Sequence, residues 1–100
     1  MNSSNKIDIS KSISKYLALR DSARDFFDYL NNLDKDELTI DFKYVNTVSR
    51  SFAQEYLIRK KAMSKQINEI NVPDNVRKMF HVVESNKQKI SISGIKTITL

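Results

Sequence analysis

The chain has 100 residues, of which 40% are hydrophobic, and it carries a formal net charge of +5 and no cysteine. A chain of this size builds one hydrophobic core and is too short for two domains. The lack of cysteine excludes a disulfide framework and a thiolate metal site. No apolar run approaches the roughly 20 residues that cross a bilayer, and residues 1–15 lack a signal-peptide core, so we expect a soluble, cytoplasmic protein without membrane association.

The excess of positive charge lies in the second half of the chain. Residues 1–50 hold eight Lys/Arg and eight Asp/Glu, whereas residues 51–100 hold nine and four. Such an asymmetry favours an acidic partner, either protein or nucleic acid, because summed surface charge steers encounter.

The first elements follow from the spacing of the apolar residues. Residues 1–6 are polar and are predicted to be a disordered N-terminus, leaving residues 7–100 as the domain. Ile7, Ile9 and Ile13, with polar residues between them, predict a first strand that can lie at a sheet edge. A helix follows, beginning between Ser14 and Asp21. Its apolar stripe is Tyr16, Leu19, Ala23, Phe26, Phe27, Leu30 and Leu33.

The next element is a predicted strand with one buried face. Its apolar residues, Leu38, Ile40, Phe42 and Tyr44, alternate with polar ones. Asp41 should point away from that face, and if both sheet faces are covered it needs a donor such as Lys43, Arg50 or a helix amide. A structural tether is favoured over an acid catalyst, because no second carboxylate has a spacing that makes a pair.

A hydroxyl-rich corner, residues 46–51, links this strand to a second predicted helix that runs from about Ser51 to Lys65. The apolar stripe of this helix is Phe52, Ala53, Tyr56, Leu57, Ala62 and Met63. Thr47, Ser49, Arg50 and Ser51 lie where the helix begins, near unpaired backbone amides and the positive end of the helix dipole. One interpretation is that Ser49 or Ser51 simply caps the helix. The other is a functional corner that tolerates an added negative charge such as a phosphate.

The densest basic cluster lies on the second predicted helix and comprises Arg59, Lys60, Lys61 and Lys65. Lys61 and Lys65 would share a helical side, and Glu55 can pair with Arg59 four residues away. A solvated face is favoured over a nucleic-acid patch, because no aromatic residue is interleaved for base stacking.

The remaining residues predict a strand, a helix and more strands. Ile67, Ile70 and Val72 form a short strand, and Pro73 with Asp74 begins a helix whose stripe is Val76, Met79, Phe80 and Val83. Ile90 and Ile92 predict another strand, Gly94 a turn, and residues 96–100 a last alternating segment. Exposed strands at either margin would allow two copies to pair as a homodimer.

Alternation of strands and helices predicts an α/β fold with a mostly parallel sheet of four or five strands and about three helices. With one glycine in the chain, phosphate-cradling loops of the GxGxxG or GxxxxGK type are excluded. His81 is the only histidine and is expected at the surface. No nucleophile, base and orienting residue can be named together, so we expect neither an enzyme nor a metal or cofactor site.

The run from Thr39 to Leu57, TIDFKYVNTVSRSFAQEYL, resembles the STAS-like domains of unknown function, in which a strand ending in Asp-Phe precedes a Ser-x-Ser-Phe-Ala-Asp-Glu helix entrance. Residues 19–24 are similar to that family's Arg-x-x-Ala helix start. Residues 71–80 are similar to the last-helix segment of the wider STAS, or anti-anti-sigma, superfamily. The resemblance covers about residues 7–93. Gln54 replaces the Asp of the STAS-like branch, and the superfamily's Asp-Ser-Ser/Thr-Gly becomes Ser-Arg-Ser-Phe at residues 49–52.

This resemblance implies a single STAS-like domain without catalytic activity, which binds a GHKL-type kinase or an anti-sigma-like protein and is switched by phosphorylation of a loop serine or threonine. The corresponding surface here comprises Thr47, Ser49, Arg50, Ser51 and Gln54. The alternative hypothesis is a small basic nucleic-acid-binding module that uses residues 59–65 with Arg77 and Lys78.

Overall fold

The computed structural model describes residues 5–85. The elements in chain order are β1 (Lys6–Asp8), α1 (Ile9–Ser12), β2 (Tyr16–Leu17), α2 (Arg20–Asn31), β3 (Glu37–Asp41), β4 (Thr47–Val48), α3 (Arg50–Ala62), β5 (Gln66–Ile70) and a helix over residues 74–85. The predicted strands at 90–92 and 96–100 and the turn at Gly94 lie outside the described residues. None of the helices between residues 5 and 85 is long and apolar enough to span a bilayer.

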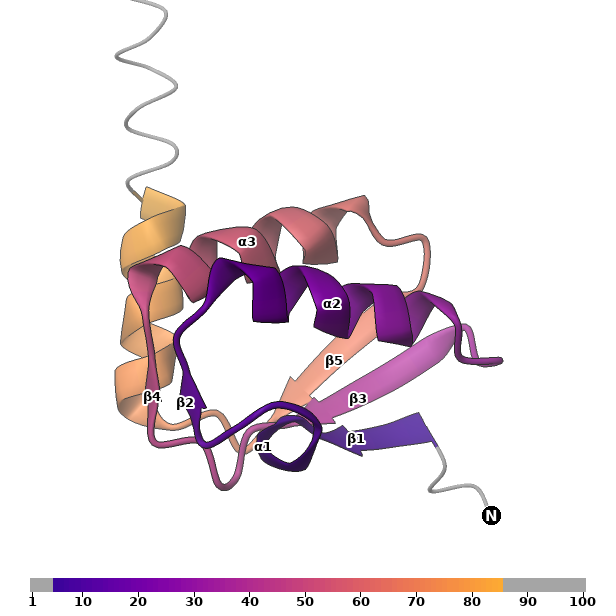
Figure 1. The fold of residues 1–100 in the computed structure, drawn as a ribbon, viewed down its shortest axis with the longest axis horizontal. Coiled ribbons are helices and arrows are strands. Elements are labelled where there is room, and N and C mark those ends of the chain that lie inside the picture. The colour runs from indigo at the N-terminus through magenta and orange to yellow at the C-terminus, as the bar shows by residue number, and fades with distance from the viewer. Residues whose placement is uncertain (1–4, 86–100) are drawn as a thin grey trace, which may run out of the picture.

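Between residues 5 and 85 all strand pairs are parallel, but they form two sheets instead of the predicted one. One sheet has the order β1-β3-β5, and the other is a two-stranded ribbon of β2 and β4. Figure 1 shows α2 and α3 side by side over the three-stranded sheet, with the ribbon leading up to the beginnings of both helices. The α/β class and the parallel pairing are therefore confirmed, with three plus two strands and four helices in the described part of the chain.

The core lies between the three-stranded sheet and the helices above it. Leu38, Ile40 and Phe42 are fully buried, as are Phe52 and Tyr56 of α3. Edge-to-face contacts join the Tyr56 ring to Phe27 of α2 at 5.0 Å and to Phe42 at 5.8 Å between centroids, and Phe80 stacks on it at 5.1 Å. The stripe predicted from Ala23 to Leu30 is thus confirmed as core. Of the stripe predicted for the second helix, Phe52, Ala53 and Tyr56 are buried, whereas Ala62 is exposed.

The first strand is shorter than predicted, because a side chain caps a helix directly after it. The Asp8 carboxylate accepts hydrogen bonds from the backbone N–H groups of Ser10 and Lys11, at 3.0 and 3.3 Å. Ile9 is therefore a buried residue of α1, and Ile13 follows that helix instead of continuing a strand.

The predicted start of the first long helix was also too early. Helix α2 begins at Arg20, so Tyr16 belongs to β2 and Leu19 is the residue before the first turn. Neither packs in the core: Tyr16 is 61% exposed and Leu19 is 68% exposed.

Strand β3 ends at Asp41, before two of the residues assigned to it from the sequence. The Asp41 carboxylate accepts a hydrogen bond from the Lys43 N–H at 2.9 Å, which turns the chain. Phe42 is still buried, and its N–H donates to the carbonyl of Ile70, but Tyr44 lies half exposed on the turn.

Helix α3 ends at Ala62, three residues before the predicted end. Met63 is extended, so Lys65 does not share a helical side with Lys61. The Lys65 ammonium instead donates to the backbone carbonyls of Leu33 and Lys35, just after α2. Strand β5 begins at Gln66 and ends at Ile70, which leaves Val72 outside it.

Candidate partner-binding corner

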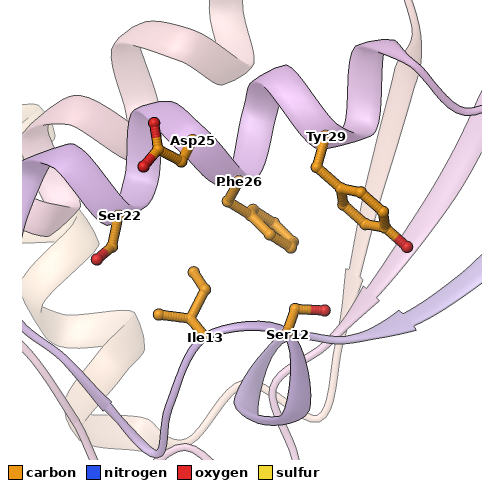
Figure 2. Close-up of a pocket in the computed structure, with 6 residues that line it drawn as sticks. All are labelled: Ser12, Ile13, Ser22, Asp25, Phe26 and Tyr29. Carbon is orange, nitrogen blue, oxygen red and sulfur yellow. The ribbon is translucent and has the colours of Figure 1, made fainter.

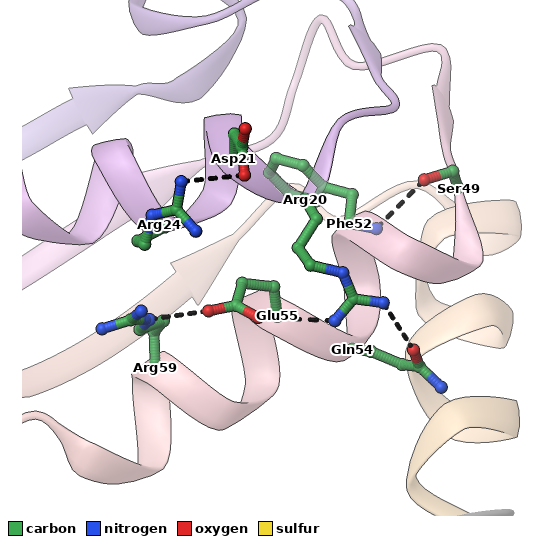
Figure 3. Close-up of polar contacts among 8 residues, drawn as sticks. All are labelled: Arg20, Asp21, Arg24, Ser49, Phe52, Gln54, Glu55 and Arg59. Atoms are coloured by element: carbon green, nitrogen blue, oxygen red, sulfur yellow. Dashed lines mark hydrogen bonds and ion pairs between the residues drawn. The ribbon is translucent and has the colours of Figure 1, made fainter.

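The beginning of α3 is fixed by Ser49. Its side-chain oxygen accepts a hydrogen bond from the Phe52 N–H at 3.0 Å (Figure 3), and its hydroxyl donates to the carbonyl of Ala18 at 2.6 Å. The capping role predicted for Ser49 is therefore present, and the hydroxyl also ties α3 to the segment before α2. Ser49 is a partly buried structural residue rather than a free hydroxyl.

The ribbon places an otherwise distant segment beside this helix start. Thr47 lies opposite Tyr16 in the parallel ladder, and the Ser49 N–H donates to the carbonyl of Leu17 at 2.8 Å. Below the ribbon, the Asn75 side-chain amide donates to the carbonyl of Asn46 at 2.7 Å, which joins the corner to the helix over 74–85. Hydrogen bonds from β2 and from the helix over 74–85 thus hold the corner in place.

We define the corner surface as the exposed residues that this arrangement brings together: Tyr16, Leu19, Thr47, Arg50 and Ser51. The side chains of Arg50 and Ser51 make no hydrogen bond or ion pair with any other residue between 5 and 85. The backbone N–H groups of both lie in the first turn of α3, where no carbonyl of the helix can accept from them. Apolar side chains, a guanidinium and hydroxyl groups are therefore all available to a partner.

Gln54 and Glu55 lie one turn further along α3 and bind Arg20. The Arg20 guanidinium donates to the Gln54 side-chain oxygen at 3.3 Å and lies 3.5 Å from the Glu55 carboxylate, which also accepts from Arg59 at 2.7 Å (Figure 3). The hydrogen bond from Arg59, with its charge and that of Arg20, lowers the pKa of Glu55 although burial opposes the shift. The predicted Glu55–Arg59 pair is thus present, and Arg20 is the member that the sequence did not reveal.

The basic cluster of α3 is largely compensated by acidic side chains. Lys60 lies 3.1 Å from Glu69 of β5, and Lys61 lies 2.6 Å from Glu84. Arg59 is held by Glu55, and Lys65 by two carbonyls, as described above. The four residues do not form an open cationic face, because each one has a partner close by.

The remaining sequence candidates are placed as follows. Asp41 is 7% exposed, and its carboxylate accepts from the Lys43 N–H and from the Asn71 side chain at 3.1 Å, with the Lys6 ammonium at 3.6 Å. Burial raises its pKa, but these hydrogen bonds and the nearby charge outweigh burial, so that the pKa is lowered. Arg50 is not a partner of Asp41.

His81 is exposed, and residues 5–85 contain no group of three acidic, histidine or cysteine side chains placed to hold a metal ion.

No family model matches the chain, and comparisons with curated proteins and with solved structures gave no match.

Proposed function

We propose that the chain is a non-catalytic, cytoplasmic regulatory module of the STAS-like type that binds a protein partner through the corner surface. The observation that supports this most is the exposure of Tyr16 and Leu19 beside the first turn of α3. Tyrosine and arginine are the residue types most often found at the energetic centres of interfaces, and here Tyr16 and Arg50 belong to one surface.

The rigidity of the corner favours the same conclusion. Ser49 joins α3 to Ala18, Thr47 pairs with Tyr16, and Arg20 joins the start of α2 to Gln54. A surface that is already ordered loses little conformational entropy on binding, so a small footprint can give useful affinity. Arg50 adds a preference for an acidic partner. From the resemblance of residues 39–57 to STAS-like domains, we propose a GHKL-type kinase or an anti-sigma-like protein as that partner.

A phosphorylation switch at this surface would act on Ser51 or Thr47 rather than on Ser49. The Ser49 hydroxyl already donates one hydrogen bond and accepts another, whereas Ser51 and Thr47 are exposed. A phosphate on Ser51 would lie in the first turn of α3, where the helix dipole and free N–H groups stabilise it, and would add charge and bulk to the interface. Mass spectrometry of the protein isolated from its own cells tests this, and modification of Ser49 alone would contradict it.

The nucleic-acid hypothesis receives less support from the described residues. Carboxylates hold Arg59, Lys60 and Lys61, and Arg77 pairs with Asp74 at 3.0 Å. Releasing these cations to phosphates would break existing ion pairs, which lowers the gain from binding.

A pull-down from the protein's own cells tests the proposed interface. The double variant Tyr16→Ala/Arg50→Glu removes an exposed ring and reverses one charge without touching the Ser49 cap. Its control is Lys35→Glu, the same charge reversal at an exposed residue after the C-terminal end of α2, away from the corner. We expect the parent chain and Lys35→Glu to recover the same partner, and the double variant to lose at least about nine-tenths of it, because central anchors dominate interface affinity. Equal recovery by all three proteins would refute the assignment.

A further inference from the structure

A second surface feature lies between α2 and the segment at the end of α1. It is a cleft of about 630 Å³, within the size range of ligand-binding pockets. Six residues line it, as shown in Figure 2: Ser12, Ile13, Ser22, Asp25, Phe26 and Tyr29.

The floor of the cleft is apolar. Phe26 is only 3% exposed. Figure 2 shows its ring, from α2, and the Ile13 side chain, from the segment after α1, both directed into the space between these two segments. The Tyr29 ring continues this surface at a centroid distance of 6.4 Å from Phe26, and it is half exposed. An aliphatic side chain laid along the floor would therefore contact three apolar groups.

The α2 wall carries one carboxylate. Asp25 is the only charged residue among the six, it lies beside Ser22, and it forms no ion pair with another described residue. Its neighbour Asp21, by contrast, binds Arg24 at 2.8 Å. Lys11 and Lys15 are exposed near the opposite wall but do not line the cleft.

The exposed face of α2 beside Asp25 carries a second carboxylate, that of Asp28. Asp25 is the charged group that lines the cleft itself, and Asp21, on the same helix, is already paired with Arg24. The carboxylates of Asp25 and Asp28 are exposed on α2. Charge complementarity therefore selects a cationic ligand here, while the apolar floor requires that the cation carry an apolar body.

We propose that this cleft binds a short basic segment of a protein partner, in which an Arg or Lys neighbours an apolar residue. The apolar side chain lies on Ile13 and Phe26, and the cationic group reaches Asp25. The hydroxyls of Ser12 and Ser22, each able to donate and accept, are available to the peptide backbone. This site shares no residue with the corner surface and does not depend on the function proposed for it.

The probe is the peptide acetyl-Leu-Arg-Leu-amide, titrated into the ¹⁵N-labelled chain at about 0.15 M salt, where the Debye length of about 8 Å screens distant charges. Amide shifts are followed by NMR. We expect saturable shifts centred on residues 12–13 and 22–29. The same peptide with citrulline, which is uncharged, in place of arginine should bind more weakly.

Two α2 variants separate a specific site from general attraction. Asp25→Asn removes the carboxylate in the cleft, and Asp28→Asn removes an exposed carboxylate of the same helix that does not line it. We expect Asp25→Asn to weaken binding about three- to fivefold, as is typical of one exposed charge pair, and Asp28→Asn to leave it nearly unchanged. Both changes are at exposed residues, so both variants should fold.

Four outcomes overturn the proposal. The first is a lack of saturable shifts up to about 10 mM peptide, which corresponds to negligible affinity. The second is that the shifts centre on residues 47–51 instead of the cleft. The third is equal weakening of binding by the two variants, and the fourth is equal binding of the citrulline peptide. Because the probe and Asp25 lie outside the corner surface, none of these outcomes affects the pull-down described above.

Discussion

Ser49 illustrates how one side chain can position a surface without belonging to it. Its oxygen satisfies the N–H of Phe52 and its hydroxyl satisfies the carbonyl of Ala18, so the N-terminus of α3 and the approach to α2 share a single anchor. Ser51, two residues later, is exposed and makes neither contact. The sequence indicated that one of these serines caps the helix but did not distinguish them, because both precede the same apolar stripe.

Ser49→Ala should therefore lower the free energy of unfolding by about 1 to 2 kcal/mol, as is found when a serine N-cap is lost. Ser51→Ala should change it by less than about 0.5 kcal/mol, as at most surface positions. Urea titrations of the two variants measure both values. Similar losses in the two variants would contradict the assignment of Ser49 as the cap.

The Ser51→Asp variant separates stability from binding at the same position. A carboxylate in the first turn of α3 interacts favourably with the helix dipole, so we expect the free energy of unfolding to rise by about 0.3 to 1 kcal/mol. Partner recovery should fall, because the added charge lies on the proposed interface. A variant that is stabilised but binds its partner as well as the parent chain would exclude a switch at Ser51.

Asp41 should give the fold a measurable dependence on acid. Its folded-state pKa lies below the ordinary value of 3.8, so the stabilisation is fully present above about pH 4 and is lost as the pH falls through the folded-state pKa. Asp41→Asn should lower the free energy of unfolding at pH 7 and also reduce the loss of stability on acidification. Denaturant midpoints at pH 7 and pH 3 test this, and an unchanged acid dependence in the variant would show that Asp41 is not tethered.

At the scale of elements, the long periodic segments were predictable and their ends were not. The stripes of α2 and α3 and the alternation in β3 come from many residues, so each pattern tolerates one or two exceptions. Each end depends on a single polar side chain: Asp8 starts α1, and Asp41 turns the chain after β3. Both aspartates stand next to alternating apolar residues, which indicated longer strands than those that form.

The ribbon of β2 and β4 was missed for a different reason. Each strand has two residues, and about 30 residues separate them in the sequence, so no periodic pattern exists to be recognised. Their pairing nevertheless determines which residues surround the beginning of α3. The hydroxyls of the candidate site were thus predictable, whereas Tyr16 and Leu19, which lie in a helix-like spacing, were not.

Helix α3 is joined to β5 by a polar contact inside the aromatic core. Tyr56 is fully buried, and its hydroxyl donates to the Glu69 carboxylate at 2.6 Å, which Lys60 also approaches. Burial raises the pKa of Tyr56 well above its ordinary range, and the Glu69 charge adds to the shift, so the phenol stays a donor at neutral pH.

Tyr56→Phe keeps the ring contacts with Phe27 and Phe80 but removes the donor. We expect the free energy of unfolding to fall by about 1.5 to 3 kcal/mol, the usual range for a hydrogen bond to a charged group. Thermal denaturation followed by circular dichroism measures it. A parent-like melting temperature would mean that the Glu69 carboxylate is satisfied without the phenol.

For the whole molecule, the distribution of charge matters more than its sum. The cations of α3 lie against carboxylates of the same domain, and the Arg50 guanidinium of the corner surface has no ion-pair partner among residues 5–85. Residues 21–37 are rich in acidic side chains. The sequence correctly placed the excess of basic residues in the second half, but pairing between distant elements, such as Lys60 with Glu69, could not be read from it.

The chain should consequently bind nucleic acid weakly and without specificity. In fluorescence anisotropy with labelled duplex DNA, we expect any binding at low salt to disappear at about 0.15 M salt, because the basic residues of α3 are already held by carboxylates and electrostatic affinity falls steeply with salt. Binding that persists at that salt concentration and is weakened by Lys60→Gln/Lys61→Gln would instead favour the nucleic-acid hypothesis.

The most direct test of the account is hydrogen–deuterium exchange on the chain alone and bound to the partner recovered by pull-down. If the corner is the interface, slowed exchange on binding is expected in residues 15–20 and 46–54, which carry the ribbon and the first turn of α3. Protection confined to β5 and the helix over 74–85, with the corner unchanged, would contradict it.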